Sequence, residues 1–414
     1  MRIVYLSPSG RMGGAEVALL DMLASVRQAE PEWTLHLIVS EEGGVAEKAR
    51  ALGVSTHVLP FPASLARIGD AAAGGPAGHS KSRLHLLAQL LLAAPAVTIY
   101  VRKLRTRLGR LEPEVIHSNG FKMHLLGAMA NRRTIPLIWH FHDYLTARPF
   151  MSRLIKLFRK RCSMALANSN SVRLDVTAVC GDAMPIQTIY NGIDTAVFTP
   201  RGESADLDLL SGLPEAGSNT IRVGMLATFA RWKGHETFLR AIALLKPDFP
   251  VRGYVVGDAL YQTDGSQYSL GQLKEMARQL GISSRIGFTG FVSNPATAMR
   301  SLDIMVHAST QPEPFGLVIV EGMACGRAVI VSEAGGAAEL IESGINALGH
   351  PPGDAVRLSE RLMELASDAS LRTRLGEAGR STAERRFNRT RLSTELTAIY
   401  RRVAATAAAD TQPH

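Results

Sequence analysis

The stretch EPFGLVIVEGMACGRAVIVS, residues 313–332, joins an apolar run to two glutamates and decides how the second half of the chain folds. In a strand, Glu313 and Glu321 would lie about 26 Å apart, since each residue advances a strand by about 3.3 Å. In a helix that begins near residues 314–316, Glu313 precedes the first turn and Glu321 lies about one turn inside. Gly326 suits a left-handed cap at the helix end, and AVIVS then begins a buried strand. We therefore predict a loop–helix–strand unit with carboxylates around the helix start.

The first turn of this helix is expected to present the free amides of Gly316 and Leu317, which favour a phosphate group. Two carboxylates beside that anion would repel it unless they bind something else, and sugar or ribose hydroxyls are the natural partners. The same spacing also fits a purely structural role, in which Glu313 caps the helix and Glu321 faces solvent.

Short apolar runs alternate with helical patterns along a chain of 414 residues, which is too long for one core. The alternation predicts an α/β fold of two doubly wound, Rossmann-like domains with parallel strands. Residues 194–220, rich in Gly, Pro, Ser and acidic residues, read as the connection between them. The expected strands are residues 2–7, 34–40, 54–60, 115–118, 136–142, 164–168 and 188–190, then 221–227, 253–257, 286–288, 304–307 and 328–332.

Two further segments follow strands and open helices. In SPSGRMGGAE, residues 7–16, Gly13 and Gly14 form a strand-to-helix turn that lacks the G-x-G-x-x-G dinucleotide pattern. In ATFARWKGHETFL, residues 227–239, Arg231 and Lys233 supply two cations that can neutralise a diphosphate. Read alone, the first also fits an ordinary tight turn, and the second a solvated loop.

The stretch LIWHFHDYL places two histidines at the end of an expected strand. His140 and His142 alternate and so face the same side, but no third ligand is apparent nearby, which argues against zinc. With Asp143 behind it, His142 suits hydrogen bonding to a substrate. We expect no metal site.

The composition, 46% hydrophobic and 20% charged, is typical of a soluble globular protein. The cysteines, Cys162, Cys180 and Cys325, are too far apart for zinc spacing and suggest a reducing compartment. The net charge of +9 is concentrated in residues 101–110 and 152–161. These basic segments fit either a solvated helix face or an anionic membrane surface. Nucleic acid is disfavoured, since no recognition motif accompanies the charge.

A membrane span and a secretory signal are both disfavoured by the apolar segments of the sequence. Residues 84–101 barely reach the length needed to cross a bilayer and contain His85, Gln89 and Pro95, so a helix buried against the sheet explains them as well. MRIVYLS reads as a first strand without a signal peptide.

The residues 313–332, with their continuation EAGGAAELI, resemble the signature of retaining nucleotide-sugar glycosyltransferases of family 4, which have the GT-B fold. The spacing of the glutamates, the GMACG turn and the GGxxE pattern carry the resemblance. Further matches are GGAE, HD, YNGID, WKG, VVGD and FTGFV. They follow the family's order along nearly the whole chain, so the combination is specific although no single motif is.

The resemblance implies an acceptor-binding domain over residues 1–195, a donor-binding domain over 196–385 that faces it across a cleft, and a helix over 386–414 that crosses back. It implies metal-independent transfer of a sugar, with retention, from a UDP- or GDP-sugar to a sugar or lipid-linked acceptor, without a cofactor. The basic segments, in turn, suggest a lipid-linked or membrane-proximal acceptor, as in cell-envelope, exopolysaccharide or glycolipid assembly, and hence a cytoplasmic protein at the inner face of the membrane.

Carried over by motif, Glu313 would hold the hydroxyls of the transferred sugar, Lys233 would bind the diphosphate, and His142 would lie near the sugar and acceptor. These three form the predicted catalytic set. The predicted donor-binding residues are Gly13, Gly14, Arg231, Lys233, Gly257, Phe315, Gly316, Leu317 and Glu321, the last on the donor ribose.

One position departs from the family pattern. The family usually carries an arginine five residues before the lysine, where this chain has Thr228. Arg231 is therefore a candidate to supply the missing charge from a shifted backbone, or else it points outward.

Two other functions stay open. A sugar-nucleotide 2-epimerase would use the same scaffold without an acceptor, so product analysis distinguishes it. A non-catalytic sugar-nucleotide-binding protein would tolerate loss of His142, Lys233, Glu313 or Glu321, yet all four are present.

Overall fold

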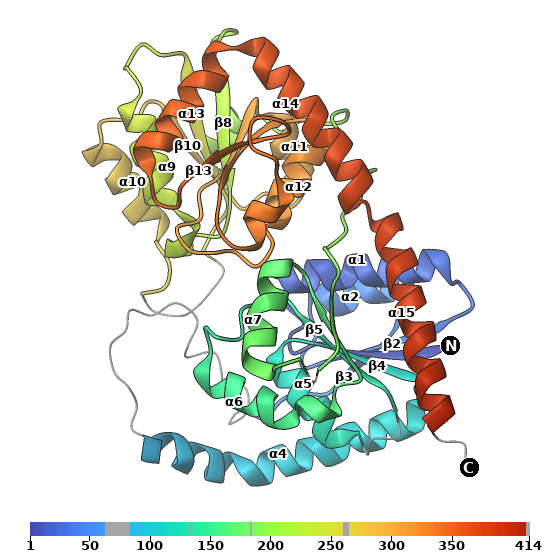
Figure 1. Cartoon of the computed structure of the whole chain (residues 1–414). Coiled ribbons are helices and arrows are strands. Elements are labelled where there is room, and N and C mark those ends of the chain that lie inside the picture. Colours follow the sequence, from blue (N-terminus) through green and yellow to red (C-terminus); the bar gives the residue numbers. More distant parts are fainter. Residues whose placement is uncertain (63–82, 132–134, 183, 260–264, 411–414) are drawn as a thin grey trace. The chain divides into compact units, whose positions relative to one another are not determined.

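The computed structural model describes residues 1–62, 83–131, 135–182, 184–259 and 265–410 (Figure 1). Contacts divide the chain into two compact units. Unit 1 comprises Met1–Gly192 and Arg389–His414, and unit 2 comprises Ile193–Asn388. Each unit contains one sheet of parallel strands connected by helices, which confirms the predicted fold of two doubly wound α/β domains.

The sheet of unit 1 has the strand order β3-β2-β1-β4-β5-β6-β7, and every described pair is parallel. Its strands are β1 (Arg2–Leu6), β2 (Thr34–Val39), β3 (Ser55–Val58), β4 (Val115–Asn119), β5 (Leu137–Phe141), β6 (Met164–Ala167) and β7 (Ile186–Thr188). The last strand lies two residues earlier than predicted. Its pairing already begins at Pro185, whose carbonyl accepts a hydrogen bond from the amide of Ala165 at 2.8 Å.

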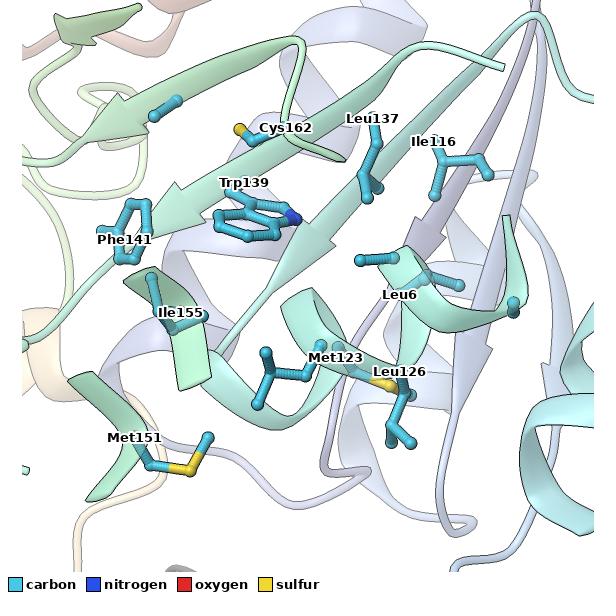
Figure 2. Packing of buried hydrophobic residues seen from close by; sticks show 14 of the residues in the cluster. Leu6, Ile116, Met123, Leu126, Leu137, Trp139, Phe141, Met151, Ile155 and Cys162 are labelled. Atoms are coloured by element: carbon cyan, nitrogen blue, oxygen red, sulfur yellow. The ribbon is translucent and has the colours of Figure 1, made fainter. Parts of the chain in front are cut away.

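Helices cover both faces of this sheet. Helices α1 (Gly14–Ala29), α2 (Gly44–Ala51) and α15 (Arg389–Asp410) contribute to one core. The other core is formed with α4 (Arg83–Leu111), α5 (Phe121–Ala130), α6 (Pro149–Phe158) and α7 (Asn170–Cys180). Figure 2 shows part of this second core, where Trp139 and Phe141 of β5 pack with Met151 and Ile155 of α6. None of the helices among the described residues has the length and apolar character needed to cross a bilayer.

The sheet of unit 2 has the order β10-β9-β8-β11-β12-β13, again with parallel pairs. Its strands are β8 (Ile221–Leu226), β9 (Val251–Val256), β10 (Ile286–Gly290), β11 (Ile304–His307), β12 (Ala328–Ser332) and β13 (Leu348–His350). Helices α9 (His235–Leu244), α10 (Leu270–Gln279) and α13 (Ala355–Ser367) form one core with it. Helix α12 (Leu317–Ala324) packs against α14 (Ala369–Thr382).

Apart from shifts of strand ends by a few residues, three elements differ from the sequence prediction. Strand β13 was missed because three residues are too short to show a pattern. The segment expected as a plain connection contains helix α8 (Leu207–Ser211), capped by the side chain of Asp206. The C-terminal helical region is interrupted at Asn388, whose extended backbone (ψ 134°) separates the π-helical turn Ala383–Phe387 from α15.

Both sheets reverse their direction of growth at one point, between β1 and β4 in unit 1 and between β8 and β11 in unit 2. Open parallel sheets bind ligands beyond the carboxyl ends of their strands at such a switch point. Gly13 and Gly14 follow β1, Lys233 follows β8 and Glu313 follows β11. These four predicted residues therefore lie on loops at the switch point of their own unit, whereas His142 follows β5 and Gly257 follows β9, each one strand away from it.

Candidate functional site

Glu313 lies in the loop between β11 and α12 and is 7% exposed. One carboxylate oxygen, Oε1, accepts a hydrogen bond from Nζ of Lys233. The other, Oε2, is 2.5 Å from Nε2 of His307 and accepts a hydrogen bond of 2.7 Å from Oγ of Ser309. His307 ends β11 and Ser309 follows it by two residues. Strand β11 and the loop after it therefore supply two neighbours of the carboxylate, and the loop after β8 supplies the cation.

Two glycines bring these loops together. Gly234, directly after the 3₁₀ turn η3 (Arg231–Lys233), has φ +83°, and a Cβ there would lie 1.8 Å from the carbonyl oxygen of Ala308. The backbone after β8 therefore packs directly on the backbone after β11, where any side chain would separate them. Gly316, with φ +97°, turns the chain into α12. The sequence folds locally in the way needed to place Lys233 beside Glu313.

The electrostatics of this pair keep Glu313 ionised. Burial opposes ionisation, but the Lys233 ammonium and the His307 ring hold the pKa of the Glu313 carboxyl well below its usual range. The Lys233 ammonium also lies 4.2 Å from the centre of the Trp232 ring. A cavity of about 10 Å³ borders Lys233, His307 and Ser309, room for about one water molecule. The site thus presents an anion and a cation side by side at the edge of the sheet.

Helix α12 begins as the sequence predicts. Gly316 is its N-cap and provides no side-chain cap, so the amides of the first turn are not used by a capping side chain. Phe315 is buried and lies 6.0 Å from the ring of Phe387. Leu317 is the first helical residue, and Glu321 is half-buried in the second turn. Gly326 closes the helix with φ +68°, as expected.

Arg231 and Gly257 have structural roles within unit 2. The guanidinium of Arg231 lies 4.4 Å from the centre of the Tyr268 ring, and its Nε donates to the carbonyl of Gly265 at 2.9 Å. Gly257 has φ +144°, and a Cβ there would lie 2.0 Å from the carbonyl oxygen of Ala227. These contacts do not involve Lys233 or Glu313. Donor binding by Arg231 and by Gly257 therefore remains a prediction.

In unit 1, Gly13 is the N-cap of α1, and a Cβ on Gly14 would meet no described atom within 4 Å. His142 follows β5, and its Nε2 is 3.0 Å from Oδ1 of Asn119 at the end of β4. Its ring centre lies 4.1 Å from that of His140, so the two histidines do face the same side. Burial lowers the pKa of His142 to about 4, so the ring is neutral at physiological pH.

Sequence reasoning did not single out His307, Ser309 or Asn119. Each lies at or just beyond the carboxyl end of a strand next to a switch point, which is the signal that could have found it. Within the described ranges, no group of three or more His, Cys, Asp or Glu side chains is arranged to hold a metal ion.

Two family models match the chain. The model described as Glycosyltransferase Family 4 matches residues 12–197, and that described as Glycosyl transferases group 1 matches residues 215–382. Together they cover both units. The chain therefore belongs to the family 4 glycosyltransferases of GT-B fold, and the resemblance seen in the sequence is confirmed.

Among curated relatives, the chain is 25% identical over 256 residues to the N-acetyl-alpha-D-glucosaminyl L-malate synthase of Bacillus anthracis, covering 62% of this chain and 64% of that protein. It is 27% identical over 319 residues to the phosphatidyl-myo-inositol mannosyltransferase of Mycobacterium tuberculosis, covering 74% and 78%. The match therefore spans slightly less than two thirds of the first relative's length. A crystal structure of Anabaena HepE in complex with UDP and glucose superposes with a TM-score of 0.76 at 25% identity, covering 96% of this chain and 99% of that one.

Proposed function

We propose that the protein transfers a sugar from a nucleotide-diphosphate donor to a hydroxyl acceptor, with unit 2 binding the donor and unit 1 binding the acceptor. The observation that carries this proposal is the Lys233–Glu313 pair at the switch point of unit 2. A lysine is suited to a phosphate, and a buried carboxylate that stays ionised is suited to sugar hydroxyls. The family to which the chain belongs supports the same activity.

In the proposed reaction, the donor diphosphate takes the ammonium of Lys233 away from Glu313. The freed oxygen of Glu313 then accepts hydrogen bonds from hydroxyls of the transferred sugar, while His307 and Ser309 continue to hold its other oxygen. The bond between the anomeric carbon and the diphosphate breaks, and a bond to the acceptor oxygen forms on the same face. Because the new bond forms on the face that the diphosphate leaves, the configuration is retained. The acceptor proton passes to the leaving phosphate.

Lys233 and the first amides of α12 neutralise charge that develops on the diphosphate. We therefore propose that transfer needs neither a metal ion nor a cofactor. Assays with excess EDTA should leave the initial rate unchanged, and a loss that Mg²⁺ or Mn²⁺ restores would overturn this part of the proposal.

The donor is best sought first among UDP-sugars, because HepE has been crystallised with UDP and with UDP-glucose. A GDP-sugar remains the second candidate. The test is a thermal-shift screen with UDP, GDP and ADP, since a nucleotide bound only by the folded protein raises its melting temperature. We expect a rise with UDP or GDP, and no rise with any nucleotide would contradict the proposal.

Product analysis separates transfer from the alternatives. A transferase releases the free nucleotide in proportion to a glycosylated acceptor, whereas a 2-epimerase converts the donor without any acceptor. A non-catalytic binding protein shows the thermal shift but neither product. The intact Lys233–Glu313 pair favours an enzyme over a non-catalytic binding protein, and the EPFGLVIVEGMACG motif favours transfer over epimerisation.

We also propose contact with an anionic membrane surface, and hence a cytoplasmic protein at the inner face of the membrane that serves glycolipid or envelope polysaccharide assembly. Residues 101–111, 121–130 and 149–161 carry basic side chains but no Asp or Glu. They belong to α4, α5, α6 and the adjoining turn η2 (Arg159–Arg161), and neighbouring helices of this series pack on one another. The groove of about 460 Å³ on them is lined by Thr98, Val101, Arg102, Arg105, Met129, Phe158 and Arg161.

Exposed apolar side chains accompany this charge, since Leu157 is 72% exposed and Ile99 is 53% exposed. The combination suits the headgroup region of a bilayer. Flotation with vesicles of neutral lipid, with and without anionic lipid, tests it. We expect binding only with anionic lipid, reduced by Arg102→Glu with Arg161→Glu. Arg105 is left intact because it donates two hydrogen bonds to carbonyls at the end of α5, whereas Arg161 donates a single bond of 3.4 Å to the carbonyl of Asn131. No binding at low salt would contradict the proposal.

A further inference from the structure

A chain of buried polar side chains runs across one face of the unit 1 sheet. The hydroxyl of Tyr5 on β1 donates to the hydroxyl of Tyr400 on α15 at 3.0 Å. The Tyr400 hydroxyl lies 2.7 Å from Nδ1 of His117 on β4. Nε2 of His117 lies 3.3 Å from Nδ1 of His140 on β5. All four residues are at most 1% exposed. The C-terminal helix is thus connected by hydrogen bonds to His140 on β5, the strand that His142 follows.

All members of this chain are uncharged. Burial raises the pKa of both tyrosines and lowers the pKa of the histidines, to about 3 for His117. A neutral histidine donates through one ring nitrogen and accepts through the other, so each hydrogen bond fixes the role of the next nitrogen.

The chain has a direction. In the order in which the Tyr5 hydroxyl donates to Tyr400, the Tyr400 hydroxyl donates its own proton to Nδ1 of His117. In the reverse order the buried Tyr5 proton would have no acceptor among the described residues. His117 then carries its proton on Nε2 and donates to Nδ1 of His140. His140 in turn carries its proton on Nε2. The order of donors and acceptors therefore ends in an N–H group at the carboxyl end of β5.

At the His140 end of this series of hydrogen bonds lie buried polar atoms that have no hydrogen-bond partner among the described residues. Nε2 of His140, Nδ1 of His142 and Nδ2 of Asn119 are buried and form no hydrogen bond within the described part of the chain. His142 stacks on His140, and its Nε2 is bonded to the carboxamide oxygen of Asn119. His142 therefore has its proton on Nε2 and a free lone pair on Nδ1. Two donors and one acceptor gather here, a set that matches a hydroxyl group, which both donates and accepts.

We propose that Tyr400 is a positioning residue that acts through His117 to fix His140 as an Nε2–H donor beside His142, and that these groups bind a hydroxyl of the acceptor at the carboxyl ends of β4 and β5. The identity of the hydroxyl rests on the proposed function. The tautomer order does not, since it follows from contacts within unit 1.

The tautomers are tested by NMR of the full-length protein with ¹⁵N-labelled histidine, because the shifts of the two ring nitrogens show which one carries the proton. We expect Nε2–H for His117 and for His140 in the wild type. Tyr400→Phe keeps the ring but removes the hydroxyl, so the resonances of both histidines should shift towards a tautomer mixture. Nδ1–H on His140 in the wild type, or unchanged spectra in the variant, would overturn the proposal.

Tyr100→Phe is the matched control. Tyr100 is also buried in unit 1, belongs to the core on the other face of the sheet, and its hydroxyl has no partner among the described residues. Its removal should leave the histidine spectra unchanged. If Tyr400→Phe does not fold, the tautomers of His117 and His140 in the wild type still test the proposal. Tyr5→Phe is then the second variant, because it removes the first donor and leaves Tyr400 in place.

Kinetics test the link to the reaction. Tyr400→Phe should lower kcat/KM for the acceptor by about threefold to tenfold, the effect of one hydrogen bond, while KM for the donor stays unchanged. Equal changes in the kinetic constants for acceptor and donor, or no change in kcat/KM for the acceptor, would contradict a role in acceptor binding. The NMR experiment tests the tautomers even if the protein transfers no sugar. A failure of the proposed function is therefore distinguishable from a failure of the tautomer proposal.

Discussion

Lys233 and Glu313, which are 80 residues apart in the sequence, form an ion pair at the carboxyl edge of the unit 2 sheet. Their side chains are only 18% and 10% exposed. The motif comparison assigned one residue to the diphosphate and the other to the sugar, but the structure brings them into direct contact. In the proposed reaction the donor diphosphate competes with Glu313 for the Lys233 ammonium, which makes the pair a measurable part of donor binding.

Replacing the carboxylate tests its role in transfer. Glu313→Gln keeps the size and the hydrogen bond from Ser309 but removes the charge opposite Lys233. We expect the transfer rate to fall by at least about 100-fold, as for other losses of a polar group that acts on the reacting centre. The unfolding free energy, measured in urea, should fall by about 1–3 kcal/mol, because Lys233 can still turn towards water.

Glu275→Gln is the control for that variant. Glu275 is an exposed glutamate on α10 that pairs with Arg278. Its replacement should change neither transfer nor stability. A Glu313→Gln enzyme of wild-type activity would remove Glu313 from the proposed site.

The ion pair also predicts a pH dependence of stability. The folded protein holds the pKa of Glu313 below the value of 4.5 expected in the unfolded chain. Its contribution is therefore fully present above that pH and is lost as the pH falls through the folded pKa. In Lys233→Met the part of this contribution that comes from Lys233 is missing, and only that from His307 remains. The difference in unfolding free energy between wild type and variant should be largest near pH 7 and should shrink below pH 4.5. A difference that stays constant with pH would argue that the variant acts through packing alone.

Lys233 and Arg231 are expected to differ as donor ligands. Lys233→Gln should weaken UDP binding by about tenfold or more, the effect of losing a charge-assisted hydrogen bond. Arg231→Gln should weaken it less than about threefold, because its guanidinium is occupied by Tyr268 and Gly265. Isothermal titration calorimetry measures both. Equal losses would show that Arg231 turns to the donor and supplies the charge missing at Thr228.

Gly14→Ala separates a functional glycine from a structural one. A Cβ at this position meets no described atom within 4 Å, so stability should not fall. The donor KM should nevertheless rise, because the family resemblance places Gly14 beside the diphosphate. Gly234→Ala is the opposite case. Its Cβ would collide with the Ala308 carbonyl, so we expect a loss of more than about 2 kcal/mol of unfolding free energy. A stable protein with unchanged donor KM after Gly14→Ala would contradict the assignment.

Much of the fold could be predicted because its signals are local. The alternation of apolar runs and helical patterns indicated two parallel sheets, and Gly316 and Gly326 marked the ends of α12 correctly. Short or irregular elements could not be predicted. Strand β13 has three residues, and α8 lies in a segment whose composition is that of a loop. Their formation depends on neighbours that a local pattern does not contain.

The sequence by itself determined the class of fold, the family and the residues at the strand ends, since periodicity, glycine positions and motif order are written along the chain. Only the tertiary structure decided which of these residues meet. Lys233 contacts Glu313 because β8 and β11 are adjacent in the sheet. Tyr400 contacts His117, 283 residues away, because α15 packs on one face of the unit 1 sheet, over β4. The order of strands and the docking of helices set these contacts. They also fix the charge of Glu313 and the neutrality of the histidines, since both depend on burial and on partners distant in the chain.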